Sequence, residues 1–279
     1  MRSGRTELDS IVQLSKHNRD MPPAPSLNAG KEGRTCIFCG SGEGLSGAGE
    51  HVLPKWLQIQ VGGSLKGGFQ GVHMSPIGHP ISRRKASGNS LTLGSVCTRC
   101  NNGWMSRLEN SFGMLLPRLQ ANPSPALFSK AERHTIAIWI LKTAIVAHRS
   151  SNYRKILPDA VPLALTQGKT IPGGVAVFSG KSETAKEIEW HQSSIFSCRV
   201  RQTDINLFDA RQDTFVFALA LSAVVLCVGW HGVGKDFEII GTDDTVHQIY
   251  PRPKLAKRIG DMGNPTGIAT SLVLTRRRG

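Results

Sequence analysis

The sequence predicts an α+β protein in two parts, a small cysteine-paired unit over residues 35–115 and a second α+β domain over residues 116–255. Three observations predict this division. Two Cys-x-x-Cys pairs, at 36–39 and 97–100, lie in a Gly-rich block with little regular periodicity. A capping-box sequence at Ser129 then opens an apolar helix. Beyond that helix, short strand-like segments alternate with Gly and Asp. A chain of 279 residues is long enough for two compact units.

Apolar spacing predicts the individual elements. After Cys100, apolar residues recur at helical spacing and predict a helix over 101–116 that Pro117 ends. The helix that opens at Ser129 is apolar almost all round, so we expect it to be buried. The apolar run 215–228 is compatible with a helix or a strand, and its length favours a buried helix. Strands are expected at 173–179, 193–200, 237–240 and 245–250.

The two ends of the chain differ from its middle. Residues 1–34 are polar and interrupted by Pro and Gly, which predicts a flexible arm, and residues 256–279 form a basic tail. The net charge of +14 favours an acidic polymer as partner, because basic side chains that neutralise phosphates release counterions. The run at 215–228 is too short to span a bilayer, and the first residues lack the apolar core of a signal peptide. We therefore expect a cytoplasmic protein with no membrane contact.

The cysteine pairs are the most informative pattern in the chain. Without an export signal, paired cysteines indicate metal ligands rather than disulfides. Two Cys-x-x-Cys pairs can close one tetrahedral zinc site, formed by Cys36, Cys39, Cys97 and Cys100. Four thiolates fill the zinc shell and leave no open position for water. The predicted zinc is therefore structural.

Catalysis would need a second ion and a base, and the pair Glu50-His51 offers candidates for both. Adjacent residues of a strand point to opposite faces, so Glu50 could face a metal while His51 faces an attacking water. Imidazole is suited to accept a proton near neutral pH. Asn101 directly follows the last cysteine, so the zinc would fix its amide oxygen. A carboxylate with an amide oxygen suits Mg²⁺ or Mn²⁺ when phosphate completes the shell.

The order Cys-x-x-Cys, acid-His-x-x-Pro, Asn, Cys-x-x-Cys-Asn resembles the HNH endonuclease family, in its zinc-containing four-cysteine subgroup. The resemblance covers roughly residues 35–112. It implies a treble-clef-like ββα-metal fold in which His51 is the general base on the scissile phosphate. Glu50 and Asn101 would bind the divalent ion that stabilises the leaving 3′ oxygen. Asn89 matches the middle Asn, which in the family orients the loop and the histidine.

Several positions depart from the family pattern. Glu50 stands where the family usually has Asp or His, and Asn101 stands where many members have His. Trp104 replaces a common Lys, so the phosphate contact could shift to Arg107. Asn102 could replace Asn101 as ligand if the helix begins one residue later.

Other basic residues are candidates for DNA contact. Arg83, Arg84 and Lys85 follow His73 and His79 in what we expect to be a Gly/Pro-rich solvated loop, and either contact a phosphate backbone or only keep the loop soluble.

The leading hypothesis is thus a metal-dependent endonuclease acting on DNA, with RNA as a further substrate left open. The alternative is a zinc-stabilised nucleic-acid-binding protein without cleavage activity. A third hypothesis makes residues 113–279 a sensing module that controls the nuclease. A homodimer would suit double-strand cleavage.

Overall fold

A computed structural model describes residues 35–45, 49–62, 68–75, 79–87, 91–151, 157–165, 169–182, 188–194, 197–199, 213–255, 269 and 271–276. Within these ranges helices and strands are mixed, and the predicted α+β class is confirmed. Residues 35–279 form one compact unit. The expected arm at 1–34 and Asn89 lie outside the described residues, as does most of the expected tail.

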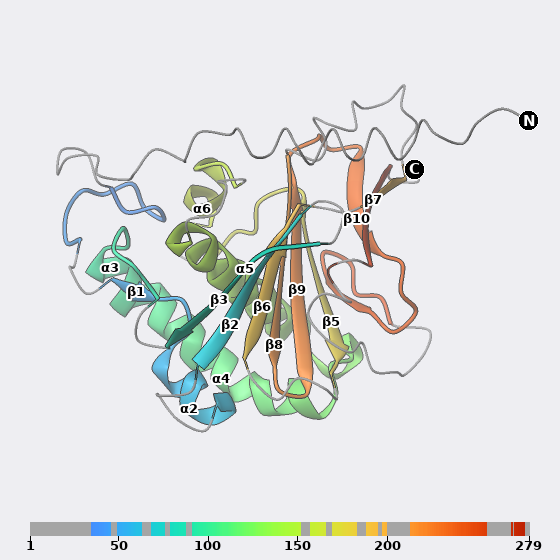
Figure 1. Cartoon of the computed structure of the whole chain (residues 1–279), viewed down its shortest axis with the longest axis horizontal. Coiled ribbons are helices and arrows are strands. Elements are labelled where there is room, and N and C mark those ends of the chain that lie inside the picture. The colour runs from blue at the N-terminus through green and yellow to red at the C-terminus, as the bar shows by residue number, and fades with distance from the viewer. Residues whose placement is uncertain are drawn as a thin grey trace, which may run out of the picture. The chain divides into compact units, whose positions relative to one another are not determined.

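A seven-stranded sheet forms the centre of this unit (Figure 1). All neighbouring strands in it are antiparallel except β2 and β6, which are parallel. In spatial order the strands are β11 (His247–Tyr250), β5 (Val175–Lys181), β9 (Val224–His231), β8 (Thr214–Leu221), β6 (Glu189–Ser193), β2 (Gly68–Met74) and β3 (Pro80–Ser87).

Two smaller sheets and a set of helices complete the described chain. One sheet has the order β10 (Phe237–Gly241), β12 (Leu272–Arg276), β7 (Ser197–Arg199), and the other pairs β1 (Glu50–His51) with β4 (Thr92–Leu93). The helices are α2 (Lys55–Gly62), α3 (Thr98–Cys100), the π-helical η1 (Asn101–Met105), α4 (Ser106–Ala121), the 3-10 turn η2 (Pro125–Leu127), α5 (Lys130–Ser150) and α6 (Ala160–Ala164).

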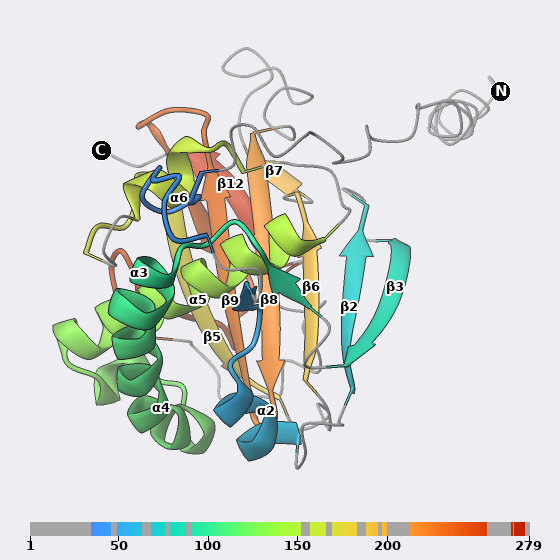
Figure 2. The ribbon, with the colours of Figure 1, turned by 90° about the vertical axis from the view of Figure 1, so that its left-hand side faces the viewer.

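The large sheet is covered on both faces. Figure 2 shows α5 lying across one face, with β7 and β12 on the opposite side. Side chains of β8 alternate accordingly: Phe217 and Leu219 join the core beneath α5, while Val216 and Ala218 pack toward the three-stranded sheet. In β8, large residues thus face the helix and smaller ones face the second sheet.

This double burial explains why the helix favoured at 215–228 is wrong. The run forms the β8–β9 hairpin, which turns at Ser222 with φ of 59°. A strand buried on both faces is apolar at every position, so it lacks the polar alternation that distinguishes a strand from a buried helix.

The loop expected around His73 is also wrong. The segment forms the β2–β3 hairpin at one edge of the large sheet, and His73 is buried in β2. A Cβ at Gly71 would lie 2.7 Å from the Trp190 indole, so the glycine allows a bulky neighbour to cover the strand. Gly71, one of the glycines of this segment, therefore belongs to a strand and not to a loop.

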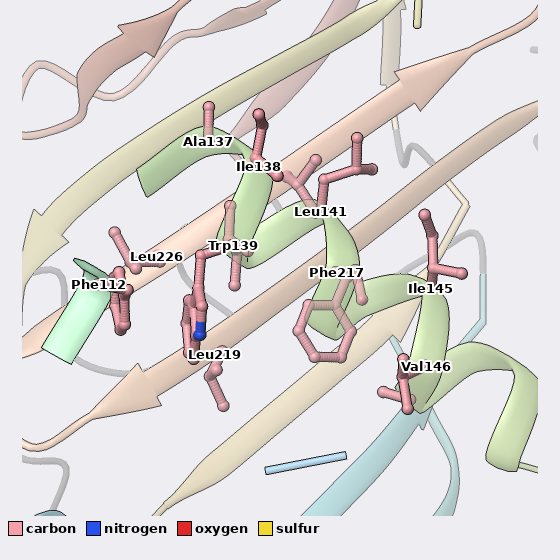
Figure 3. Close-up of a cluster of buried hydrophobic side chains, with 14 of the residues drawn as sticks. Phe112, Ala137, Ile138, Trp139, Leu141, Ile145, Val146, Phe217, Leu219 and Leu226 are labelled. Carbon is pink, nitrogen blue, oxygen red and sulfur yellow. The ribbon is translucent and has the colours of Figure 1, made fainter. Parts of the chain in front are cut away.

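Helix α5 is buried as expected. Its side chains are buried from Ile136 to His148, and Figure 3 shows Trp139 and Leu141 among the side chains of β8 and β9. Trp139 stacks on Phe112 of α4, with ring centroids 3.7 Å apart and planes 3° from parallel. The predicted capping box is confirmed, since Ser129 Oγ accepts from the Glu132 amide and the Glu132 carboxylate accepts from the Ser129 amide.

The helix predicted at 101–116 is α-helical only from Ser106, because Asn101–Met105 form the π-helical η1, in which Gly103 has non-helical φ and ψ of −93° and −106°. Pro117 does not end the helix. Helix α4 continues through Pro117 to Ala121. Leu116 and Leu119, on either side of the proline, are fully buried. Their packing outweighs the one backbone hydrogen bond that proline cannot donate.

The expected domain boundary at residue 115 falls inside α4. One hydrophobic core runs from Cys36 through Phe112 and Trp139 to Ile249. Because the two predicted parts share this core, residues 35–115 and 116–255 do not form separate hydrophobic cores.

We expect Ser129→Ala to lower the free energy of unfolding by about 1 kcal/mol, because the amides at the start of α5 lose their acceptor. Urea denaturation measures the change. The control is Ser111→Ala in α4, whose hydroxyl bonds only to the Arg107 carbonyl within the helix. Equal losses in both variants would contradict a capping role.

Candidate metal centre and acid–histidine pair

The four paired cysteines converge on one point. The Sγ atoms of Cys36, Cys39, Cys97 and Cys100 all lie within 4.8 Å of one another. A tetrahedral zinc with Zn–S bonds of about 2.3 Å places its sulfur atoms roughly 3.8 Å apart, and the Sγ atoms of Cys39 and Cys97 are 3.6 Å apart. The set can therefore hold a metal ion such as zinc, and the described ranges contain no second cluster of this kind.

Backbone hydrogen bonds bring the two cysteine pairs together. In the first pair, the Cys36 amide donates to the Ser41 carbonyl and the Gly40 amide to the Cys36 carbonyl, with Gly40 at φ of 71°. The two segments are joined because the Ile37 amide donates to the Ser95 carbonyl at 3.0 Å. The first pair thus forms a tight turn. Backbone hydrogen bonds, and not only contacts between sulfur atoms, hold it beside the segment that leads to the second pair.

The thiols differ in their tendency to ionise. Burial acts to raise the pKa of Cys36, but backbone amides of Cys97, Phe38 and Cys39 donate to its sulfur and lower the pKa to about 7. Burial raises the pKa of Cys100 far above that of an ordinary thiol. A dication would provide the charge that stabilises all four thiolates.

The second cysteine pair is followed directly by the helical segment that carries Asn101. The Asn101 amide donates to the Cys97 carbonyl at 3.0 Å, so the residue begins η1 directly after the second cysteine pair. Strand β4 ends at Leu93, four residues before Cys97, and pairs antiparallel with β1. In sequence order, the first cysteine pair is followed by the β1–β4 strand pair, then by the second cysteine pair and the helical segment.

Glu50 is buried and ion-paired. Its Oε1 lies 2.8 Å from the Lys142 Nζ, and the same nitrogen lies 2.7 Å from the Glu109 Oε1. The Lys142 side chain has no exposed surface, and the Glu50 and Glu109 side chains are 6% and 17% exposed. Burial acts to lower the pKa of Lys142, but the two carboxylates raise it, so the ammonium persists through neutral pH.

His51 is half-buried on β1, beside Glu50. Its Nδ1 is enclosed and has no hydrogen-bond partner among the described residues, so Nε2 is the nitrogen that can reach water.

The candidate DNA-contact residues lie on two elements. Arg83, Arg84 and Lys85 belong to β3, the edge strand of the large sheet, where the side chains of Arg83 and Lys85 are exposed. Arg107 is exposed on α4.

Lys142 is not among the site residues that the sequence predicts. A single charged residue in the middle of an otherwise apolar helical run was its signal, because a fully buried lysine requires carboxylate partners.

Compared with protein families, curated proteins and solved structures, the chain has no significant match in any of the three. Among the helices that the structure describes, none has the length and apolar character of a membrane span.

We expect the purified chain to contain one zinc ion, and Cys100→Ala to lose it, because three thiolates leave the tetrahedral shell open. Elemental analysis measures the content. The control is Cys227→Ala, since Cys227 is a buried free thiol of β9 outside the cluster. Zinc retained by Cys100→Ala would exclude the four-cysteine site.

We expect Lys142→Met to lower the free energy of unfolding by about 3–5 kcal/mol, because it leaves two largely buried carboxylates without a cation. The triple variant Lys142→Met/Glu50→Gln/Glu109→Gln should recover most of the loss, since it leaves no unpaired charge. Urea denaturation compares the variants. The raised pKa of Lys142 means that the stabilisation is kept at neutral pH and lost only as pH rises through the folded-state pKa. A single variant as stable as the triple one would contradict the ion-pair role.

Proposed function

We propose that the protein is a metal-dependent endonuclease of HNH type that hydrolyses DNA phosphodiester bonds. One observation carries the proposal: the four cysteines converge on one point, the β1–β4 strand pair that bears His51 lies between the two cysteine pairs in the sequence, and the helical segment that begins at Asn101 directly follows the second pair. A zinc-bound strand–strand–helix unit with this residue order is what the resemblance in the sequence implies.

The charge of the acid cluster is compatible with a second cation. Two carboxylates around the single ammonium of Lys142 leave one negative charge uncompensated. Only Oε1 of Glu50 contacts Lys142, so Oε2 remains for a metal, together with the Asn101 amide oxygen. When bound, Mg²⁺ or Mn²⁺ would stabilise the negative charge on the leaving 3′ oxygen.

His51 would act as the general base. Its Nε2 accepts a proton from the attacking water, because Nδ1 is enclosed and cannot reach solvent. Asn89 would orient the loop and the histidine, by the resemblance. Arg83, Arg84, Lys85 and Arg107 would contact the phosphate backbone, as the charge of +14 favours. In this proposal the enzyme acts in the cytoplasm on DNA, and a homodimer would cut both strands.

The Glu50–Lys142 contact also favours a second candidate function, a zinc-stabilised nucleic-acid-binding protein without cleavage. A carboxylate already paired with an ammonium binds a metal more weakly than a free one. Binding that weakens steeply with salt, with no cleavage in any divalent ion, would favour this alternative.

We expect His51→Ala to reduce plasmid nicking in Mg²⁺ or Mn²⁺ by roughly 10²–10⁴-fold, because a general base contributes about this much. Agarose-gel rates measure the effect, and zinc content verifies that the variant is folded. The control is His79→Ala, an exposed histidine just before β3.

A His51→Ala protein that binds zinc and cuts at the full rate would exclude this assignment. Loss of the same size in His79→Ala would show that the effect is not specific to His51.

A further inference from the structure

Lys142 lies within residues 116–255, for which the sequence predicts no specific role, yet it contacts Glu50 of the candidate site. It lies on α5 with no exposed surface, and its Nζ joins Glu50 of β1 to Glu109 of α4. A buried ammonium is stable only when carboxylates stay beside it. The ion pair therefore holds β1 and α4 at fixed places against α5.

Strand β1 needs such an anchor because it is very short. It consists of Glu50 and His51, which pair with Thr92 and Leu93, and the Val52 amide adds one further bond to the Leu91 carbonyl at 3.1 Å. Two residue pairs supply few ladder hydrogen bonds, and a short two-stranded ribbon is not stable by itself.

The orientation of His51 follows from this anchor. A catalytic imidazole is usually held by a hydrogen bond at its second nitrogen, but Nδ1 of His51 has no partner among the described residues. Its direction is therefore set by the backbone of β1 together with the packing around the enclosed side of the ring. Adjacent strand residues point to opposite faces, so the buried Glu50 side chain directs His51 the other way.

We propose that Lys142 is a positioning residue for His51: by holding the Glu50 carboxylate, it fixes β1 and so fixes the direction of the imidazole. The inference rests on the proposed nuclease function for its kinetic consequence, though the positioning itself can be observed without cleavage.

The test compares full-length wild type, Lys142→Met and Lys130→Met, the last being an exposed lysine on the same helix. Zinc content and near-ultraviolet circular dichroism verify folding. Carbon-13 labelling of histidine reports His51 by its Cε1–Hε1 signal, assigned through its loss in His51→Ala. If Lys142→Met does not fold, the triple variant Lys142→Met/Glu50→Gln/Glu109→Gln takes its place in the spectroscopic measurement.

We expect one sharp His51 signal in wild type and Lys130→Met, and a shifted or broadened one in the Lys142 variant. We also expect nicking by folded Lys142→Met to fall about 10²-fold in kcat with little change in KM, as for a misplaced catalytic group. An unchanged His51 signal in a folded Lys142 variant overturns the inference and leaves the nuclease proposal intact. Absence of nicking by wild type overturns the nuclease proposal, while the His51 signal still decides the positioning role.

Discussion

The buried ammonium of Lys142 is the interaction on which the rest of the candidate site depends. Helix α5 is buried against the large sheet, so its central lysine cannot reach water. The cost of burying that charge is offset only because β1 and α4 each supply a carboxylate. Strand β1 bears Glu50 and His51, and α4 follows the segment that begins at Asn101. Both elements are thus held in place by one buried charge. The same contact explains why Glu50 is buried although it comes from a two-residue strand.

The four-cysteine cluster is joined to this core as well. The hydrophobic cluster that includes α5 also contains Cys36, Cys97 and Cys100. Phe38, which lies between the cysteines of the first pair, packs edge-to-face on Trp104 with ring centroids 5.5 Å apart. Small zinc-bound modules usually fold only when the metal binds, because they bury too little apolar surface to be stable without it. Here the metal would instead fix the two cysteine pairs locally, while α5 and the large sheet supply the buried apolar surface that stabilises the fold. Zinc would then set the start of the helix at Asn101, and the ion pair would set β1.

The sequence predicted those features that depend on neighbouring residues and missed those that depend on distant ones. Two residues separate the cysteines of each pair, and two separate Ser129 from Glu132, so these patterns are local, and both are realised in the structure. For the run 215–228 the sequence leaves helix and strand open and its length favours a helix, because both faces of the β8–β9 hairpin are covered, one by α5 and one by the three-stranded sheet. Pro117 was mistaken for a helix end because the burial of Leu116 and Leu119 is a tertiary effect. Lys142 pairs with Glu50 across 92 positions, a separation that no local pattern reveals.

These contacts change what a truncated protein can show about function. A fragment of residues 35–115 keeps all four cysteines, His51 and Asn101, and by sequence it is the natural unit to isolate. It ends inside α4 and lacks α5, so Glu50 and Glu109 lose their cation and Phe112 loses the stacked Trp139. Such a fragment could bind zinc and still fail to hold β1 in place. Its inactivity would therefore say nothing against the full chain, whereas activity in the fragment would show that β1 does not require the ion pair.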